Sequence, residues 1–118
     1  MMGIKFQMKN KILIISSEFP PGPGGIGSHA YNMANELNRR GYSIIINTKS
    51  DYVNGQQEIS FDLTCSFKTY RFKRKKRLLL TWIHRLKTIR ETIIKYEITN
   101  IIISGEFSIW TIPFIKFY

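Results

Sequence analysis

The regular pattern of the chain begins with an uninterrupted apolar run, Ile12–Ile15, that leads into a turn rich in proline and glycine. Because the run does not alternate apolar and polar residues, it is typical of a strand buried on both faces of a parallel sheet. The prolines at 20, 21 and 23 lack the N–H groups of a central strand, so the strand must end before them. The glycines that follow are Gly24, Gly25 and Gly27. A strand, a glycine-rich loop and a helix N-terminus in this order predict an anion-binding corner of an α/β fold.

The helix after the loop is predicted to run from about Ile26 to Arg40. Apolar side chains recur on one of its faces at intervals of three and four residues, and they are Ile26, Ala30, Met33, Ala34 and Leu37. Gly41 is a suitable residue to end this helix. Tyr42–Thr48 is rich in β-branched residues and is predicted to be the second strand. Strand, helix and strand in succession predict a βαβ unit with parallel strands and a right-handed crossover.

A third and a fourth strand are predicted downstream, and a short edge strand before them. Glu58–Asp62 follows an Asn-Gly turn signal and is expected to be a short edge strand. Phe67–Phe72 alternates apolar and polar residues, which predicts a strand with one less-covered face. Asn100–Ser104 contains another continuous apolar run, which Gly105 ends. The fold class that follows is α/β, with a Rossmann-like parallel sheet and flanking helices.

A long helix is predicted from the basic run at Lys73 to about Tyr96, and a second, interrupted at Pro113, over Phe107–Tyr118. The apolar stripe of the long helix comprises Leu79, Trp82, Ile83, Leu86, Ile89, Ile93 and Tyr96. Its polar side is expected to carry Arg85, Lys87, Arg90, Glu91 and Lys95.

The composition is typical of a folded α/β domain. Of the 118 residues, 43% are hydrophobic, which is enough for a packed core. We expect residues 1–10 to be a loose tail and residues 11–118 to be an incomplete domain of a larger protein, because the strand–helix alternation would normally continue. The lone Cys65 cannot form an internal disulfide, and no signal peptide is apparent, which favours the cytoplasm. No apolar run approaches the roughly 18 residues of a membrane-spanning helix.

The net charge of +10 lies almost entirely in the second half of the chain. Residues 1–62 hold six Lys/Arg and five Asp/Glu, whereas residues 63–118 hold twelve and three. This asymmetry indicates an anionic partner. The basic cluster and the tryptophan of the amphipathic helix behind it predict peripheral docking on the anionic inner face of the plasma membrane, through Arg71, Lys73, Arg74, Lys75, Lys76, Arg77 and Trp82. The alternative is a solvated helix face. Nucleic-acid binding is disfavoured, since no recognition motif accompanies the charge.

Three segments, Phe19–Pro21, Gly24–His29 and Asn32–Tyr42, together with the strand that follows them, resemble the N-terminal domain of family 4 glycosyltransferases. Those enzymes have the GT-B fold, in which two Rossmann-like domains face a cleft. The resemblance is specific over Lys11–Thr48 and rests only on the order of elements as far as Tyr118. It makes the chain a partial N-terminal domain of a GT-B fold.

The resemblance implies a retaining hexosyltransferase that needs neither a metal nor a cofactor and uses a nucleotide-sugar as co-substrate. It implies that the loop of Gly24, Gly25 and Gly27 lies near the donor diphosphate, and that the acceptor is a glycan or a lipid-linked molecule. Many family members carry a histidine at the end of the fourth strand, where this chain has Ser104–Glu106. The donor-binding C-terminal domain is not in the sequence, so we expect the chain to be inactive without that domain or a partner chain.

Position in the predicted fold singles out three further candidate contacts for an acceptor. Glu18 and Glu106 follow the first and fourth strands, and ligands of open α/β sheets bind at the carboxyl ends of strands. His29 lies in the first turns of the first helix. The alternative is that Glu18 and Glu106 are solvent-facing loop carboxylates and that His29 is an ordinary helix residue. For the glycine loop, the alternative is a tight turn that serves only packing.

Several other sites are excluded by spacing. The loop lacks the G-x-G-x-x-G dinucleotide fingerprint and the Gly-Lys-Ser/Thr of a P-loop. No metal site is expected, since His29 and His84 lack paired ligands. Two alternatives to a glycosyltransferase stay open. One is a non-catalytic Rossmann-like module that uses its basic face to bind a membrane or a partner, and the other is a nucleic-acid-binding protein.

Overall fold

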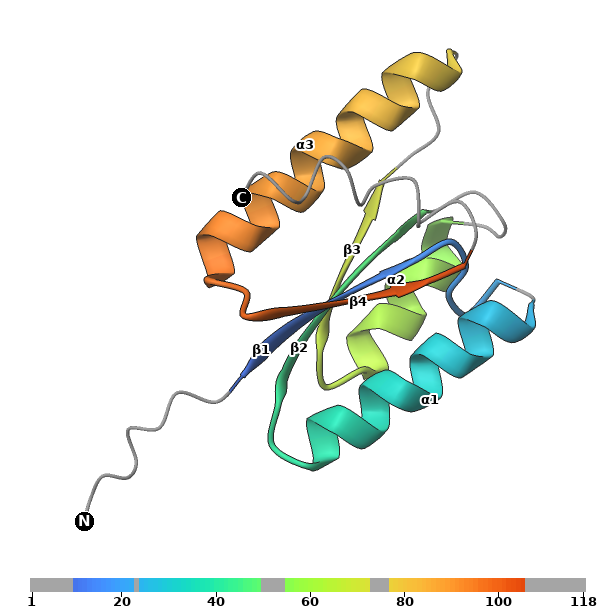
Figure 1. Ribbon diagram of the computed structural model, residues 1–118. Helices are drawn as coiled ribbons and strands as arrows, with labels where there is room; N and C mark the ends of the chain where they lie inside the picture. Colours follow the sequence, from blue (N-terminus) through green and yellow to red (C-terminus); the bar gives the residue numbers. More distant parts are fainter. Residues whose placement is uncertain (1–9, 23, 50–54, 73–76, 106–118) are drawn as a thin grey trace.

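The computed structural model describes residues 10–22, 24–49, 55–72 and 77–105. Strands and helices alternate along this part of the chain, and the four strands form one all-parallel sheet in the order β3-β2-β1-β4 (Figure 1). The elements are β1 (Lys11–Ser16), α1 (Gly25–Arg39), β2 (Ser43–Lys49), α2 (Gly55–Thr64), β3 (Lys68–Phe72), α3 (Leu78–Tyr96) and β4 (Asn100–Ser104). The predicted Rossmann-like α/β fold is confirmed.

The helices cover both faces of the sheet, with α1 and α2 on one face and α3 on the other (Figure 1). The chain steps outward from β1 to β2 and β3, and then returns across the sheet to place β4 on the other side of β1. Right-handed crossovers that run in opposite directions put their helices on opposite faces, which explains the position of α3. The strand order therefore reverses between β1 and β4, and the carboxyl ends of the strands at such a point are the usual ligand position in open α/β sheets.

The two central strands form the core. Ile12 and Ile14 of β1, together with Ile44 and Ile46 of β2, pack on the face of α1, where Ala30 and Ala34 are fully buried. Leu13, Ile15 and Ile45 pack on the opposite face against Ile89 of α3. The continuous apolar runs thus predicted burial on both faces correctly.

The two edge strands are less covered. Thr69, Tyr70 and Arg71 in the middle of β3 are partly buried, as are Ile101–Ile103 of β4. Tyr70 lies against Tyr96 of α3, with the two hydroxyl groups in hydrogen-bond contact. Burial, followed by this hydrogen bond, raises the pKa of Tyr70 to about 12. The alternation predicted a strand that is less covered than the first two, and β3 is less buried than β1 and β2; its position at an edge of the sheet was not predicted.

The prediction of a strand at Glu58–Asp62 is wrong, because these residues belong to α2. The inner side of this helix carries Glu58, Phe61 and Asp62, and its outer side exposes Ile59 and Leu63. The carboxylates turn inward because Arg71 lies opposite them. Because polar residues lie on the buried side of α2 and apolar residues on its exposed side, the sequence does not show the apolar spacing that is typical of an amphipathic helix.

The predicted apolar stripe of α3 is also partly wrong. Ile89 is buried as expected, but Leu79 is 66% exposed and Ile83 is 51% exposed. Arg85, expected on the polar side, is only 4% exposed. The helix is rotated so that this guanidinium reaches polar acceptors at the strand ends, which a cation in the interior requires.

Several predictions lie outside the described residues. They concern the tail up to residue 9, the basic residues 73–76 and the helix at Phe107–Tyr118. Within the described part, α3 begins at Leu78 rather than at Lys73.

Candidate functional site

The glycine loop lies at the carboxyl end of β1, as predicted, and α1 begins directly behind it. Gly24 precedes the first helical residue with φ 125° and ψ 145°, a conformation that only glycine adopts readily. A Cβ placed on Gly25 would have no atom within 4 Å. The N-terminus of α1 has no side-chain cap. No side chain therefore caps its first N–H groups, and helix N-termini favour anions.

Gly27 has a different role from Gly25. A Cβ at Gly27 would lie 2.9 Å from the backbone nitrogen of Phe19 and 3.0 Å from its Cα atom. Gly27 is therefore required for the close packing of α1 on the loop. The packing alternative holds for Gly27, whereas Gly25 stays available for a ligand.

The carboxylate of Glu18 lies against Gly24. A Cβ at Gly24 would meet Glu18 Oε1 at 2.0 Å, and Oε1 is buried without a hydrogen-bond partner in the described part of the chain. The Ser16 hydroxyl shapes this turn, because it donates to the Glu18 carbonyl at 2.5 Å and accepts from the Glu18 N–H at 3.4 Å. A negative charge is favourable near a helix N-terminus. The unpaired oxygen is suited to accept a hydrogen bond from a hydroxyl group.

Of the other two predicted acceptor contacts, only His29 lies in the described part of the chain. His29 is exposed on α1, beyond the loop. Glu106 lies outside the described residues. The residue before it, Gly105, has φ 100°, and a Cβ there would lie 1.9 Å from Ser17 Oγ. The Ser17 N–H donates to the Ser104 carbonyl at 3.1 Å, so the ends of β1 and β4 meet closely beside the glycine loop.

An aromatic cluster anchors the loop to the core. Phe19 is fully buried, and its ring lies edge-on to Tyr31, Phe61 and Phe67, with centroid distances of 6.0, 6.4 and 6.1 Å. Edge-to-face pairs of this kind stabilise beyond the area that they bury. The loop is consequently held at its start, before the glycines.

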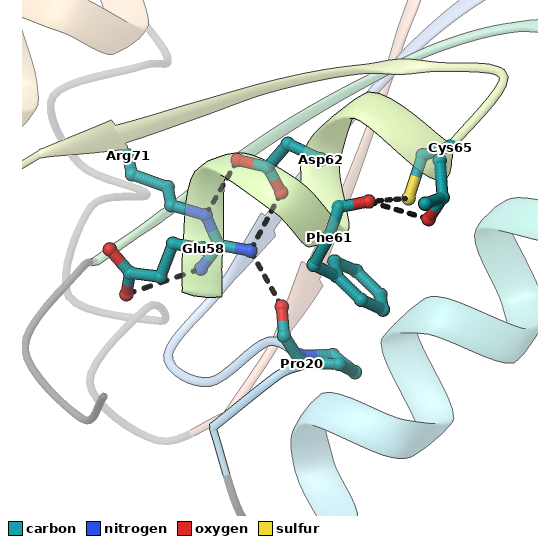
Figure 2. Close-up of polar contacts among 7 residues, drawn as sticks. Pro20, Glu58, Phe61, Asp62, Cys65 and Arg71 are labelled. Carbon is teal, nitrogen blue, oxygen red and sulfur yellow. Dashed lines mark hydrogen bonds and ion pairs between the residues drawn. The ribbon is translucent and has the colours of Figure 1, made fainter. Parts of the chain in front are cut away.

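Arg71 of β3 provides a second anchor, shown in Figure 2. Its Nη2 donates to the Pro20 carbonyl at 2.6 Å and to Asp62 Oδ1 at 2.9 Å, and its Nε donates to Asp62 Oδ2 at 2.9 Å. Glu58 Oε2 lies 3.7 Å from Nη1. The Arg71 side chain is only 8% exposed. One guanidinium thus joins β3, α2 and the loop after β1.

This burial corrects the prediction that Arg71 belongs to the membrane-facing basic cluster. The carboxylates of Glu58 and Asp62 draw its guanidinium inward. Of the other predicted membrane contacts, Arg77 is exposed and Trp82 is partly buried, and the four at 73–76 lie outside the described residues.

Arg85 lies at the carboxyl edge of the sheet, a position that the sequence pattern did not predict. Arg85 Nη2 donates to the Ser16 carbonyl at 3.3 Å, and Nε lies 3.5 Å from Asn47 Oδ1. Its Cζ atom lies 4.8 Å from the centroid of the Phe72 ring. Burial lowers the pKa of Arg85 to about 10, so the side chain still carries its charge at neutral pH. The signal that could have revealed it is Asn47-Thr48, a polar end to an apolar strand.

Asn47 and Thr48 are both fully buried at the end of β2. Asn47 Nδ2 and Thr48 Oγ1 have no hydrogen-bond partner in the described ranges. Buried polar groups without partners are uncommon in native structures, and they concentrate here at the edge where α/β proteins bind ligands.

Cys65 shows no feature of a nucleophile. Its thiol donates to the Phe61 carbonyl at 3.5 Å. Burial, followed by the charge of Asp62, raises its pKa. A raised pKa reduces the thiolate fraction, and the thiolate is the reactive form.

The described residues contain no group of three or more His, Cys, Asp or Glu side chains placed to hold a metal ion. Within the same residues, no helix combines the length and the apolar character needed to cross a membrane. Neither models of protein families nor curated proteins match this chain.

The two glycines provide a matched pair for mutation. We expect Gly27→Ala to destabilise the fold by about 1–3 kcal/mol, because the new methyl group would overlap the Phe19 backbone. We expect Gly25→Ala to leave the free energy of unfolding within about 1 kcal/mol or to raise it, because its Cβ enters open space and alanine favours helix. Urea unfolding followed by circular dichroism measures both. Equal destabilisation would contradict the separate roles of the two glycines.

We expect Arg71→Ala to cost about 3 kcal/mol, because it leaves two carboxylates and the Pro20 carbonyl without their buried partner. Arg39 forms an exposed ion pair with Glu36 at the end of α1, and Arg39→Ala is the control, with a much smaller effect. The same unfolding measurement compares them. Similar losses for the two variants would show that the Arg71 network does not hold the fold together.

Proposed function

We propose that this chain is the acceptor-side N-terminal part of a retaining glycosyltransferase, which moves a sugar from a nucleotide-sugar to a glycan or a lipid-linked acceptor. The observation that carries the proposal is the open N-terminus of α1 at Gly25, beside the unpaired carboxylate oxygen of Glu18. Both lie at the carboxyl end of β1, where the strand order reverses. The resemblance of Lys11–Thr48 to family 4 enzymes adds to it.

The N–H groups at the start of α1 and the carboxylate of Glu18 suit different parts of the substrates. Backbone N–H groups at a helix N-terminus suit the diphosphate of the donor. A carboxylate repels a phosphate but accepts hydrogen bonds from sugar hydroxyl groups. We therefore assign Gly25 and the start of α1 to the donor diphosphate, and Glu18 to a hydroxyl of the acceptor. His29 and Glu106 are further candidates for the acceptor side.

The proposal includes a second domain or partner chain that holds most of the donor, and it requires no metal and no cofactor. We expect purified residues 1–118 to show no transfer from a nucleotide-sugar. The tests below therefore measure binding, which the N-terminal part retains if the assignment is right.

Glu18→Ala separates the two subsites. Without the carboxylate, we expect inorganic pyrophosphate to bind about fivefold more tightly, since a like charge a few ångströms away costs about 1 kcal/mol in water. The methyl glycosides of glucose and mannose, used as acceptor mimics, should bind more weakly. Amide chemical shifts of the nitrogen-labelled chain report both titrations, with the largest shifts expected at Gly24, Gly25 and Gly27.

Gly25→Val is the companion variant. Its side chain points into open space, so the fold should persist while the approach to the helix N-terminus narrows. We expect the shifts caused by pyrophosphate, UDP-glucose or GDP-mannose to disappear. The proposal fails if none of these compounds shifts the loop amides of the unmodified chain, or if Gly25→Val binds them as well as the unmodified chain does.

A second candidate function, a module that docks on anionic membranes, is favoured by the outer face of α3. Apolar and basic side chains share this exposed face, and they are Leu79, Leu80, Ile83, Arg77, Lys87 and Arg90. Apolar side chains among cations are typical of helices that lie at a lipid interface. Each cation near an anionic surface contributes on the order of 1 kcal/mol.

Vesicle co-sedimentation tests this candidate. We expect the chain to bind vesicles that contain phosphatidylserine at low salt, and not vesicles of phosphatidylcholine alone. Leu79→Glu should weaken binding about tenfold by adding a negative charge to the docking face. Leu63→Glu, an exposed position on the opposite face of the sheet, is the control. Binding that is absent, or equally weakened by both variants, would rule out this surface.

A further inference from the structure

The outer side of α2 and the start of β3 form an apolar surface that the functions proposed above do not use. Ile59 is 57% exposed and Leu63 is 82% exposed, one helical turn apart. Exposed apolar patches on a soluble domain mark interaction sites. The helix that carries this pair, α2, lies on the opposite face of the sheet from α3 (Figure 1).

A pocket of about 320 Å³ lies beside these two side chains, and its lining is formed by Ile59, Asp62, Leu63, Phe67, Lys68 and Thr69. Asp62 adds little free negative charge to it, because both carboxylate oxygens accept from Arg71. The pocket is at the small end of the range for ligand sites. It suits one or two apolar side chains better than a whole cofactor.

The strand next to the pocket has an unpaired edge. Among the described residues β3 pairs only with β2, so its other side presents backbone N–H and C=O groups without a neighbouring strand. Such an edge is a template for a further strand. The five residues Lys68–Phe72 offer roughly 17 Å of edge at 3.3 Å per residue.

Charge selects among the strands that could pair there. Lys68 is exposed at the start of β3, and its Nζ lies 5.5 Å from the centroid of the Tyr70 ring. The whole chain carries a net charge of +10. Two copies would repel each other, whereas an acidic segment would be attracted.

We propose that the edge of β3 and the adjacent pocket bind an extended, acidic segment of a partner protein. The segment adds a strand to β3 through backbone hydrogen bonds and inserts one bulky aliphatic side chain between Ile59 and Leu63. Backbone pairing supplies affinity, and the pocket supplies selectivity for the side chain. This surface does not include the glycine loop, so the proposal does not depend on the glycosyltransferase assignment.

The probe is a fluorescent peptide, Asp-Glu-Val-Thr-Leu-Thr-Val-Glu-Asp, titrated against the full chain and followed by polarisation. We expect saturable binding, together with slower amide exchange over Lys68–Phe72. Leu63→Glu should weaken binding at least about tenfold, which corresponds to the loss of one buried anchor. Leu63 is exposed, so this change should not disturb folding. Leu79→Glu on α3 adds the same charge elsewhere and should leave affinity unchanged.

A second peptide tests strand addition itself. Replacing its second threonine and the valine that follows with proline keeps the leucine anchor but removes two consecutive backbone donors and fixes two dihedral angles, so binding should be lost. The proposal is overturned if neither peptide binds, if the proline peptide binds equally well, or if Leu63→Glu and Leu79→Glu have equal effects. Light scattering of the unmodified chain and of Leu63→Glu measures the oligomeric state. If the unmodified chain is a dimer and Leu63→Glu is a monomer, the surface binds a second copy of the chain and the proposal is overturned.

Discussion

The buried guanidinium of Arg71 joins three parts of the chain that are distant in sequence. It extends from β3 to the carboxylates of Glu58 and Asp62 in α2, and to the Pro20 carbonyl in the loop after β1. A cation in the interior is tolerated only where charged and polar partners surround it. This requirement determines which side of α2 faces the core and where the glycine loop begins.

The inward turn of these carboxylates has a consequence on the outer surface of α2. A short helix that directs its polar residues toward an arginine must direct Ile59 and Leu63 outward. The rotation of α3 that turns its own Arg85 toward Ser16 and Asn47 of the sheet exposes Leu79 and Ile83 in the same way. These two exposed apolar surfaces of the described residues thus arise from arginines that are buried between a helix and the sheet.

The carboxyl edge of the sheet concentrates the unpaired polar groups of the described residues. Glu18 Oε1 and Asn47 Nδ2 are both buried there without hydrogen-bond partners, and the N-terminus of α1 opens beside Glu18. Unpaired groups of this kind cost stability, so their clustering at the usual ligand position favours a binding role. The proposed function assigns the N-terminus of α1 to an anion and the carboxylate beside Gly24 to a hydroxyl group, a division that the glycine spacing did not suggest.

The sequence by itself determined the sheet and the loop. The unbroken apolar runs at Ile12–Ile15 and Ile44–Ile46 can be satisfied only by strands covered on both faces, and Gly24 and Gly105 occupy positions where φ is positive. Only the tertiary structure decided the faces of α2 and α3 and the burial of Arg71 and Arg85. The physical reason is that a local pattern records the average polarity of a helix face, whereas the partner of a buried charge comes from another part of the chain.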